Sequence, residues 1–162
     1  MKRGEKVILA VIAVVVLSLM GRNLWHVESG NDVDKGIPYY STASATLTRD
    51  AMDVYRQQGC KDCHSLWTVK NMLETIPAPI LDGLGSLHSE EWFYQYFSAT
   101  NPQTIVPSRL KPEFKMPSYA QLPDNERHLL ASYMASLKVK DWYLEETRKA
   151  EYEKLTGNEY HP

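Results

Sequence analysis

The chain has 162 residues, of which 43% are hydrophobic and 23% are charged, so it can form one small folded domain with additional segments. Its 18 basic and 20 acidic residues give a formal charge of −2, which argues against a basic nucleic-acid-binding protein and against intrinsic disorder. With only 2 cysteines, the chain cannot be a disulfide-rich scaffold.

The N-terminal segment has the pattern of a membrane anchor. Three basic residues precede an apolar run from Val7 to Met20, and this order predicts a cytoplasmic N-terminus and an exported remainder. As one helix, residues 7–25 would be about 28 Å long, which is close to the thickness of the apolar part of a membrane. The sequence therefore predicts a transmembrane helix within residues 1–25. The alternative is a cleaved signal peptide, for which Val27 and Ser29 form a weak cleavage site.

A polar linker and three helices are predicted after the anchor. Residues 26–47 are polar and contain glycine, proline and serine, which is typical of a tether. Apolar residues at helical spacing predict three helices, from Arg49 to Gln58, from Glu90 to Ala99, and from Asp124 to Leu137. Their predicted N-cap residues are Thr48, Ser89 and Asp124. No strand-like alternation of useful length is visible, and three short helices give too small a core for a domain over residues 48–139, so something else must fill its centre.

The most informative feature is the sequence Cys60-Lys61-Asp62-Cys63-His64, a C-x-x-C-H pattern that is typical of c-type haem attachment. Two thiols at this spacing can each add to one vinyl group of a haem and form thioethers. The adjacent His64 is then held where a ring nitrogen can bind the iron. A covalently attached porphyrin would also supply the missing core, so the sequence predicts one haem c.

Other uses of this pattern have less support. A thioredoxin-type redox pair needs a βαβ context, which the sequence does not show. A structural zinc site needs four ligands, and the chain has no second cysteine pair. A disulfide between Cys60 and Cys63 would leave His64 without a role.

A second axial ligand of the iron would favour electron transfer over the binding of small molecules, and a methionine thioether is the usual choice for a high reduction potential. Met116 is the best candidate, because it lies in a stiff, proline-rich loop just before the last predicted helix. Met72 is the next candidate. His88 and His128 are further possible donors, although an isolated histidine is more often a surface residue.

These residues resemble the class I cytochrome c family over roughly residues 47–139. The resemblance rests on the motif from Gly59 to His64, the stretch Ala78-Pro79-Ile80-Leu81, the loop Met116-Pro117-Ser118-Tyr119 and the last predicted helix. It implies a mostly α fold, a small helical haem domain, in which Pro79 offers its carbonyl oxygen to the ring N–H of His64; Pro77 is the alternative. The segment of residues 65–76 departs from the family because it contains no glycine.

Residues 140–162 extend beyond the usual end of that family's domain. Aromatic and charged residues alternate there, and the charges include the favourable helical pair Glu145 and Lys149. The segment is interpreted either as a solvated helical extension or as a docking arm for a larger complex, since aromatic residues in a polar tail are typical of interfaces.

The arrangement of anchor, haem domain and extension is similar to the membrane-anchored cytochrome c subunits of respiratory complexes. The resemblance implies a single-pass protein of the cytoplasmic membrane with its haem domain on the periplasmic side, which transfers single electrons and is not itself an enzyme. The implied partners are membrane-embedded redox subunits of a quinol-oxidising or oxidase or reductase complex, a soluble electron carrier and membrane lipid, with no nucleic acid. The alternative is a haem c protein with an open iron site, such as a peroxidase-like enzyme or a gas sensor, and it requires that Met116 does not bind the iron.

Overall fold

The computed structural model describes residues 4, 11–21, 35–67, 69, 76 and 78–162. The chain divides into two units, residues 1–36 and 37–162, and the boundary lies within the predicted linker.

In the first unit, residues 11–21 are helical and their side chains are exposed. Within the described residues, no helix combines the length and the apolar character needed to cross a membrane. Much of the predicted anchor over residues 1–25 lies outside the described residues, and so does the weak cleavage site at Val27 and Ser29.

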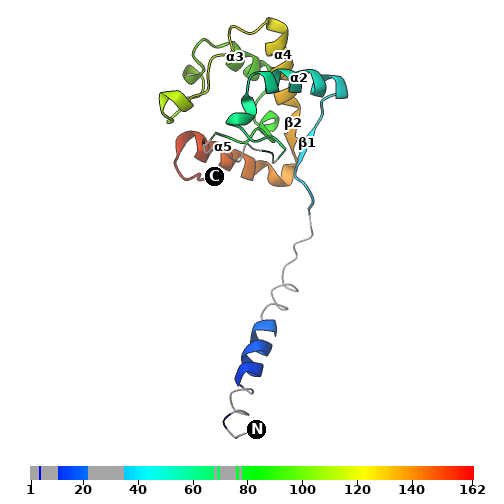
Figure 1. The fold of residues 1–162 in the computed structure, drawn as a ribbon, viewed down its shortest axis with the longest axis vertical. Coiled ribbons are helices and arrows are strands. Elements are labelled where there is room, and N and C mark those ends of the chain that lie inside the picture. Colours follow the sequence, from blue (N-terminus) through cyan, green and yellow to red (C-terminus); the bar gives the residue numbers. More distant parts are fainter. Residues whose placement is uncertain (1–3, 5–10, 22–34, 68, 70–75, 77) are drawn as a thin grey trace. The chain divides into compact units, whose positions relative to one another are not determined.

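The second unit is mostly helical, as predicted. Its α-helices are α2 (Ala45–Gln57), α3 (Glu90–Ser98), α4 (Asp124–Ser136) and α5 (Leu144–Thr156), and its strands are β1 (Tyr39–Ser41) and β2 (Leu137–Val139) (Figure 1). The three helices predicted before residue 140 are thus confirmed, and α5 provides a helix in the predicted extension. Short 3-10 turns, such as the one at Cys60–Asp62, separate these elements.

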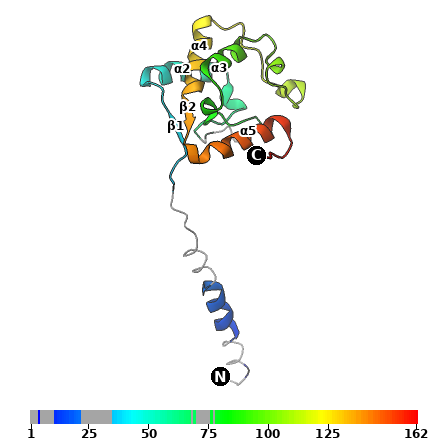
Figure 2. The same cartoon turned by 180° about the vertical axis from the view of Figure 1, so that it is seen from behind.

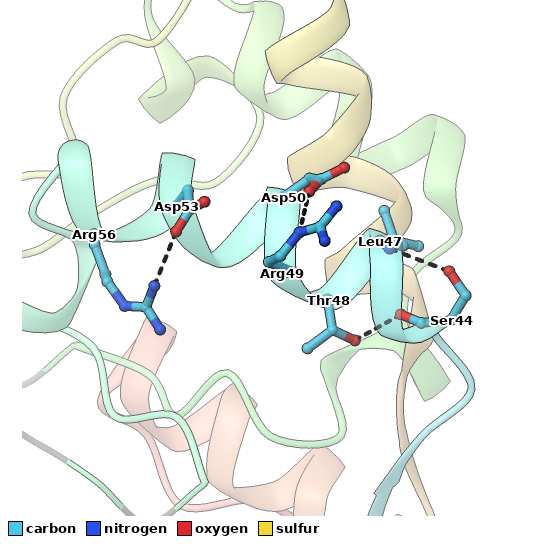
Figure 3. Close-up of polar contacts among 7 residues, drawn as sticks. All are labelled: Ser44, Leu47, Thr48, Arg49, Asp50, Asp53 and Arg56. Atoms are coloured by element: carbon cyan, nitrogen blue, oxygen red, sulfur yellow. Dashed lines mark hydrogen bonds and ion pairs between the residues drawn. The ribbon is translucent and has the colours of Figure 1, made fainter.

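The start of α2 differs from the prediction. The helix begins four residues before Arg49, and its N-cap is Ser44, whose Oγ accepts a hydrogen bond from the backbone N–H of Leu47 at 3.1 Å. Thr48, the predicted cap, lies inside the first turn and donates its hydroxyl to the carbonyl oxygen of Ser44 at 2.9 Å (Figure 3). Either hydroxyl could cap a helix, but Ser44 has the extended backbone that an N-cap requires.

Two local ion pairs lie along the exposed side of α2 (Figure 3). Arg49 contacts its neighbour Asp50 at 2.9 Å, and Arg56 contacts Asp53, one turn before it, at 3.0 Å. Pairs that are this accessible to water add little to stability, so α2 is held mainly by its buried face. That face contains Ala51, Val54 and Tyr55.

The N-caps of the other two predicted helices were expected at Ser89 and Asp124, and only the first is observed. Ser89 Oγ accepts the backbone N–H of Trp92 at 3.2 Å. At α4, Pro123 takes the N-cap position and makes no side-chain cap bond. The Asp124 carboxylate instead accepts the hydroxyl of Tyr94 at 2.6 Å, a partner on α3 that the sequence does not reveal.

The two strands were not predicted. They pair antiparallel, with Tyr39 opposite Val139 and Ser41 opposite Leu137. Each strand has three residues, which is too short for an alternating pattern to be visible in a sequence. Because β1 lies within the predicted linker over residues 26–47, the last part of that linker belongs to the domain.

Helix α4 lies at the centre of the unit and packs against both α2 and α3. Its Leu130 and Tyr133 are almost completely inaccessible to water, as is Leu137 directly after it. Gly85 packs so closely on the end of α4 that a methyl group there would overlap the carbonyl oxygen of Ala135. In both views α5 lies on the opposite side of the unit from α3 (Figures 1 and 2).

Candidate cofactor cavity

A cavity of about 900 Å³ lies inside the second unit. Side chains from α2, α3, α4 and α5 line it, and most of them are aliphatic or aromatic. Its volume is in the range of natural cofactor sites. The four helices therefore line a cavity in the domain. The sequence had indicated that three short helices give too small a core for this domain.

The C-x-x-C-H motif begins where α2 ends. Gly59 has a φ of +67°, a left-handed conformation that costs glycine little and that turns the chain from α2 into the motif. The backbone N–H of His64 donates to the carbonyl oxygen of Cys60 at 2.9 Å, which closes the motif into one compact turn. As a result Cys60, Cys63 and His64 all line the cavity, and no disulfide joins the two cysteines.

His64 is oriented by a backbone carbonyl. The side chain is nearly buried, with 9% of its surface exposed, and its Nδ1 lies 2.8 Å from the carbonyl oxygen of Pro79. A carbonyl oxygen can only accept, so Nδ1 carries the proton and Nε2 carries the lone pair that a metal needs. The family resemblance implies this contact for Pro79. Pro77, the alternative, lies outside the described residues.

Met116 lines the same cavity as His64. Its loop is fastened to the preceding segment, because Gln103 Nε2 donates to the carbonyl oxygen of Met116 at 2.9 Å and Ser118 Oγ donates to that of Ala99 at 2.8 Å. Prolines and these two bonds restrict the loop, which was predicted to be stiff. The structure thus brings Cys60, Cys63, His64, Pro79 and Met116 to one cavity.

The other donors considered from the sequence differ in position. Met72 lies outside the described residues. His128 does not line the cavity: 53% of its side chain is exposed, and its ring stacks on Tyr94. His88 does line the cavity, but its Nε2 lies 2.7 Å from a carboxylate oxygen of Glu151.

The environment of the thiols has a low polarity. Burial raises the pKa of Cys60 to about 11, and a hydrogen bond with the Tyr119 hydroxyl only partly opposes this shift. Burial also raises the pKa of Tyr119 and Tyr55 above the ordinary value for a phenol. All three groups are therefore neutral at physiological pH, so this part of the cavity wall carries no charge from them.

The contribution of α5 to the wall of the cavity was not predicted from the sequence. Ala150, Glu151 and Leu155 line the cavity, although they belong to the extension that was expected to lie beyond the haem domain. A weak signal exists, because the buried Thr147 shares one helix face with Glu151 and Leu155. This helix face contains too few apolar residues for its burial to be predicted from the sequence.

Comparison with protein-family models, with curated proteins and with solved structures finds no match for this chain. In the part of the chain that the structure describes, no group of three or more His, Cys, Asp or Glu side chains is placed to hold a metal ion. The iron of a haem needs only two axial side chains, because the porphyrin supplies the other ligands. Two thiols, an oriented imidazole, a thioether and apolar walls around one cavity fit that group.

Proposed function

We propose that the second unit is a monohaem c-type cytochrome domain with the class I cytochrome c fold. The observation that carries this proposal is the convergence of the C-x-x-C-H motif and Met116 on one apolar cavity. Cys60 and Cys63 would hold one haem c through thioethers, and His64 and Met116 would be the side chains that bind its iron. When bound, the haem would supply one-electron redox chemistry.

The chain's own residues contribute orientation and the exclusion of water. The carbonyl oxygen of Pro79 fixes the ring of His64 and keeps the proton on Nδ1. The loop contacts of Gln103 and Ser118 hold the backbone on either side of Met116, and a thioether ligand favours the reduced state of the iron. The neutral phenols and aliphatic side chains that line much of the cavity would limit the access of water to the bound group.

We further propose that the protein is an electron-transfer subunit and not itself an enzyme. Residues 1–25 would anchor it in the cytoplasmic membrane, with the haem domain on the periplasmic side; the basic residues before the apolar run support this orientation. Its partners would be lipid, the membrane-embedded redox subunits of a respiratory complex and a soluble electron carrier. Trp142 and Tyr152, both about two-fifths exposed, are candidates for contacts with such a complex.

The experiment that tests the haem site is the absorption spectrum of the full chain made in cells that can attach haem c. After denaturation in alkaline pyridine, the pigment is expected to stay with the polypeptide. In the oxidised native protein, a weak near-infrared band from sulfur to iron is expected. Pigment that separates from the chain would overturn the proposal. Covalent pigment without that band, together with ready CO binding to the reduced protein, would favour the open-iron alternative.

The role in a complex is tested separately, by purification in a mild detergent. Redox subunits that migrate with the full chain would support an electron-transfer subunit. A chain that carries haem but migrates alone at every detergent concentration would point to a free-standing carrier.

A further inference from the structure

Helix α5 covers one side of the cavity, and contacts along its length hold it in that position. At its start, the buried Thr147 packs beside Gly83 and Val139, which ties the helix to the small sheet. One turn later, Ala150 and Glu151 face the cavity, and Leu155 does so one turn further. The helix therefore lies along the cavity rather than away from the domain.

The first fastening is a bond between α5 and the segment before α3. Glu151 Oε1 lies 2.7 Å from His88 Nε2, and only 16% and 22% of these side chains are exposed. The ring of His88 cannot turn freely, because it stacks on Trp92 with centroids 3.9 Å apart and planes 15° apart. A partly buried bond between an oriented imidazole and a carboxylate is stronger than an exposed ion pair.

The second fastening is at the other end of α5, where Gly157 ends the helix with a φ of +72°. The guanidinium of Arg109 lies directly over this glycine, so that a methyl group there would overlap it, and Arg109 Nε donates to the carbonyl oxygen of Leu155 at 3.4 Å. A cation at the C-terminus of a helix is stabilised by the helix dipole. Arg109 belongs to the same proline-rich segment as Met116, so this contact links α5 to the loop of the proposed ligand.

We infer that α5 is a built-in wall of the haem cavity and that Glu151 and Arg109 are positioning residues that hold it closed. This inference rests on the proposed function. Oxidised iron carries one more positive charge than reduced iron, so water near it favours the oxidised state. A closed wall therefore raises the reduction potential, and an opened wall lowers it.

The test uses the full-length protein with Glu151→Ala, with Glu146→Ala as the matched control on the exposed side of the same helix. Two quantities are measured: the reduction potential, by spectroelectrochemistry, and the hydrogen exchange of the α5 backbone amides. Glu151→Ala is expected to lower the potential and to speed the exchange of α5 amides by roughly tenfold, since one charge-assisted bond is lost. Glu146→Ala is expected to change neither quantity.

Two further variants keep the test decisive if Glu151→Ala folds poorly. Glu151→Gln keeps an acceptor oxygen. Its reduction potential and its rate of α5 hydrogen exchange are therefore expected to lie between those of the parent and those of Glu151→Ala. Gly157→Ala displaces Arg109 and strains the left-handed turn, so it is expected to lower the potential from the other end of α5.

The outcomes separate this inference from the proposed function. Covalent pigment with an unchanged potential and unchanged α5 exchange in Glu151→Gln and Gly157→Ala would overturn the role of α5 and leave the haem proposal standing. A chain that never retains covalent pigment would overturn the haem proposal and this inference together.

Discussion

The C-x-x-C-H motif and helix α5 line the same cavity, but the sequence specifies their positions in different ways. Residues 59–64 form a compact turn whose hydrogen bonds connect near neighbours. The C-x-x-C-H pattern can therefore be recognised in six consecutive residues of the sequence. Helix α5 is placed by contacts with His88 and Arg109, which lie 63 and 46 residues from their partners. The residues proposed to attach the cofactor are thus close together in the sequence, whereas the walls of the cavity come from distant parts of the chain.

The largest effect, on the covalent attachment of the pigment, is expected from substitutions in the C-x-x-C-H motif. Replacing both Cys60 and Cys63 by serine removes the thiols and is expected to abolish covalent attachment, since no other cysteine exists in the chain. The measurement is the pigment that remains with the polypeptide after denaturation in alkaline pyridine. Pigment that stays with this double variant would show that the motif is not the attachment site.

The next effect concerns the proposed second ligand. Met116→Ala is expected to keep the covalent pigment and to lower the reduction potential, because the thioether that favours reduced iron is lost. Met52→Ala is the control, since Met52 packs against the core and does not line the cavity. An equal potential in the parent and in Met116→Ala would contradict the ligand assignment.

A smaller effect tests the packing that places the distant region. In Gly85→Ala, the new methyl group would overlap the carbonyl oxygens of Met134 and Ala135. The free energy of unfolding is expected to fall by about 1–3 kcal/mol, since the backbone must move apart. Denaturant unfolding measures this change. An unaltered midpoint would contradict the close contact between Gly85 and the end of α4.

The smallest effect distinguishes two neighbouring hydroxyls. Ser44→Ala removes the N-cap of α2 and is expected to cost about 1 kcal/mol of unfolding free energy. Thr48→Ala, which removes only a bond to the Ser44 carbonyl oxygen within the first turn, is expected to cost less. Thermal unfolding of the two variants side by side gives the ranking, and the reverse order would restore Thr48 as the cap.

Much of the candidate site was predictable because its signals are local. The motif letters identify three of its residues, and a methionine in a proline-rich loop identifies Met116. The helices α2, α3 and α4 were predictable because each has an apolar face at helical spacing. The Pro79 contact came only from the family resemblance, because no feature of its local sequence aims a carbonyl oxygen at His64.

The rest depends on contacts that no local pattern contains. The strands are three residues long, and β1 forms only because it pairs with β2, which follows α4 much later in the chain. The cap at Asp124 was wrong because Tyr94, on another helix, engages the carboxylate. Helix α5 presents Glu151, Glu153 and Lys154 to the cavity together with Ala150 and Leu155. Charged residues at such positions resemble those of an exposed helix, and only the structure shows His88 beside Glu151.

The pairing of Tyr39 with Val139 has a consequence for the order of biogenesis. Since 100 residues separate Tyr39 from Val139 along the chain, the sheet can close only after the segment that carries the C-x-x-C-H motif, α2, α3 and α4 has been made. If the motif binds haem as proposed, its two sulfur atoms would be accessible to an incoming tetrapyrrole until the two strands pair. Pairing of the strands would then follow the attachment of the cofactor.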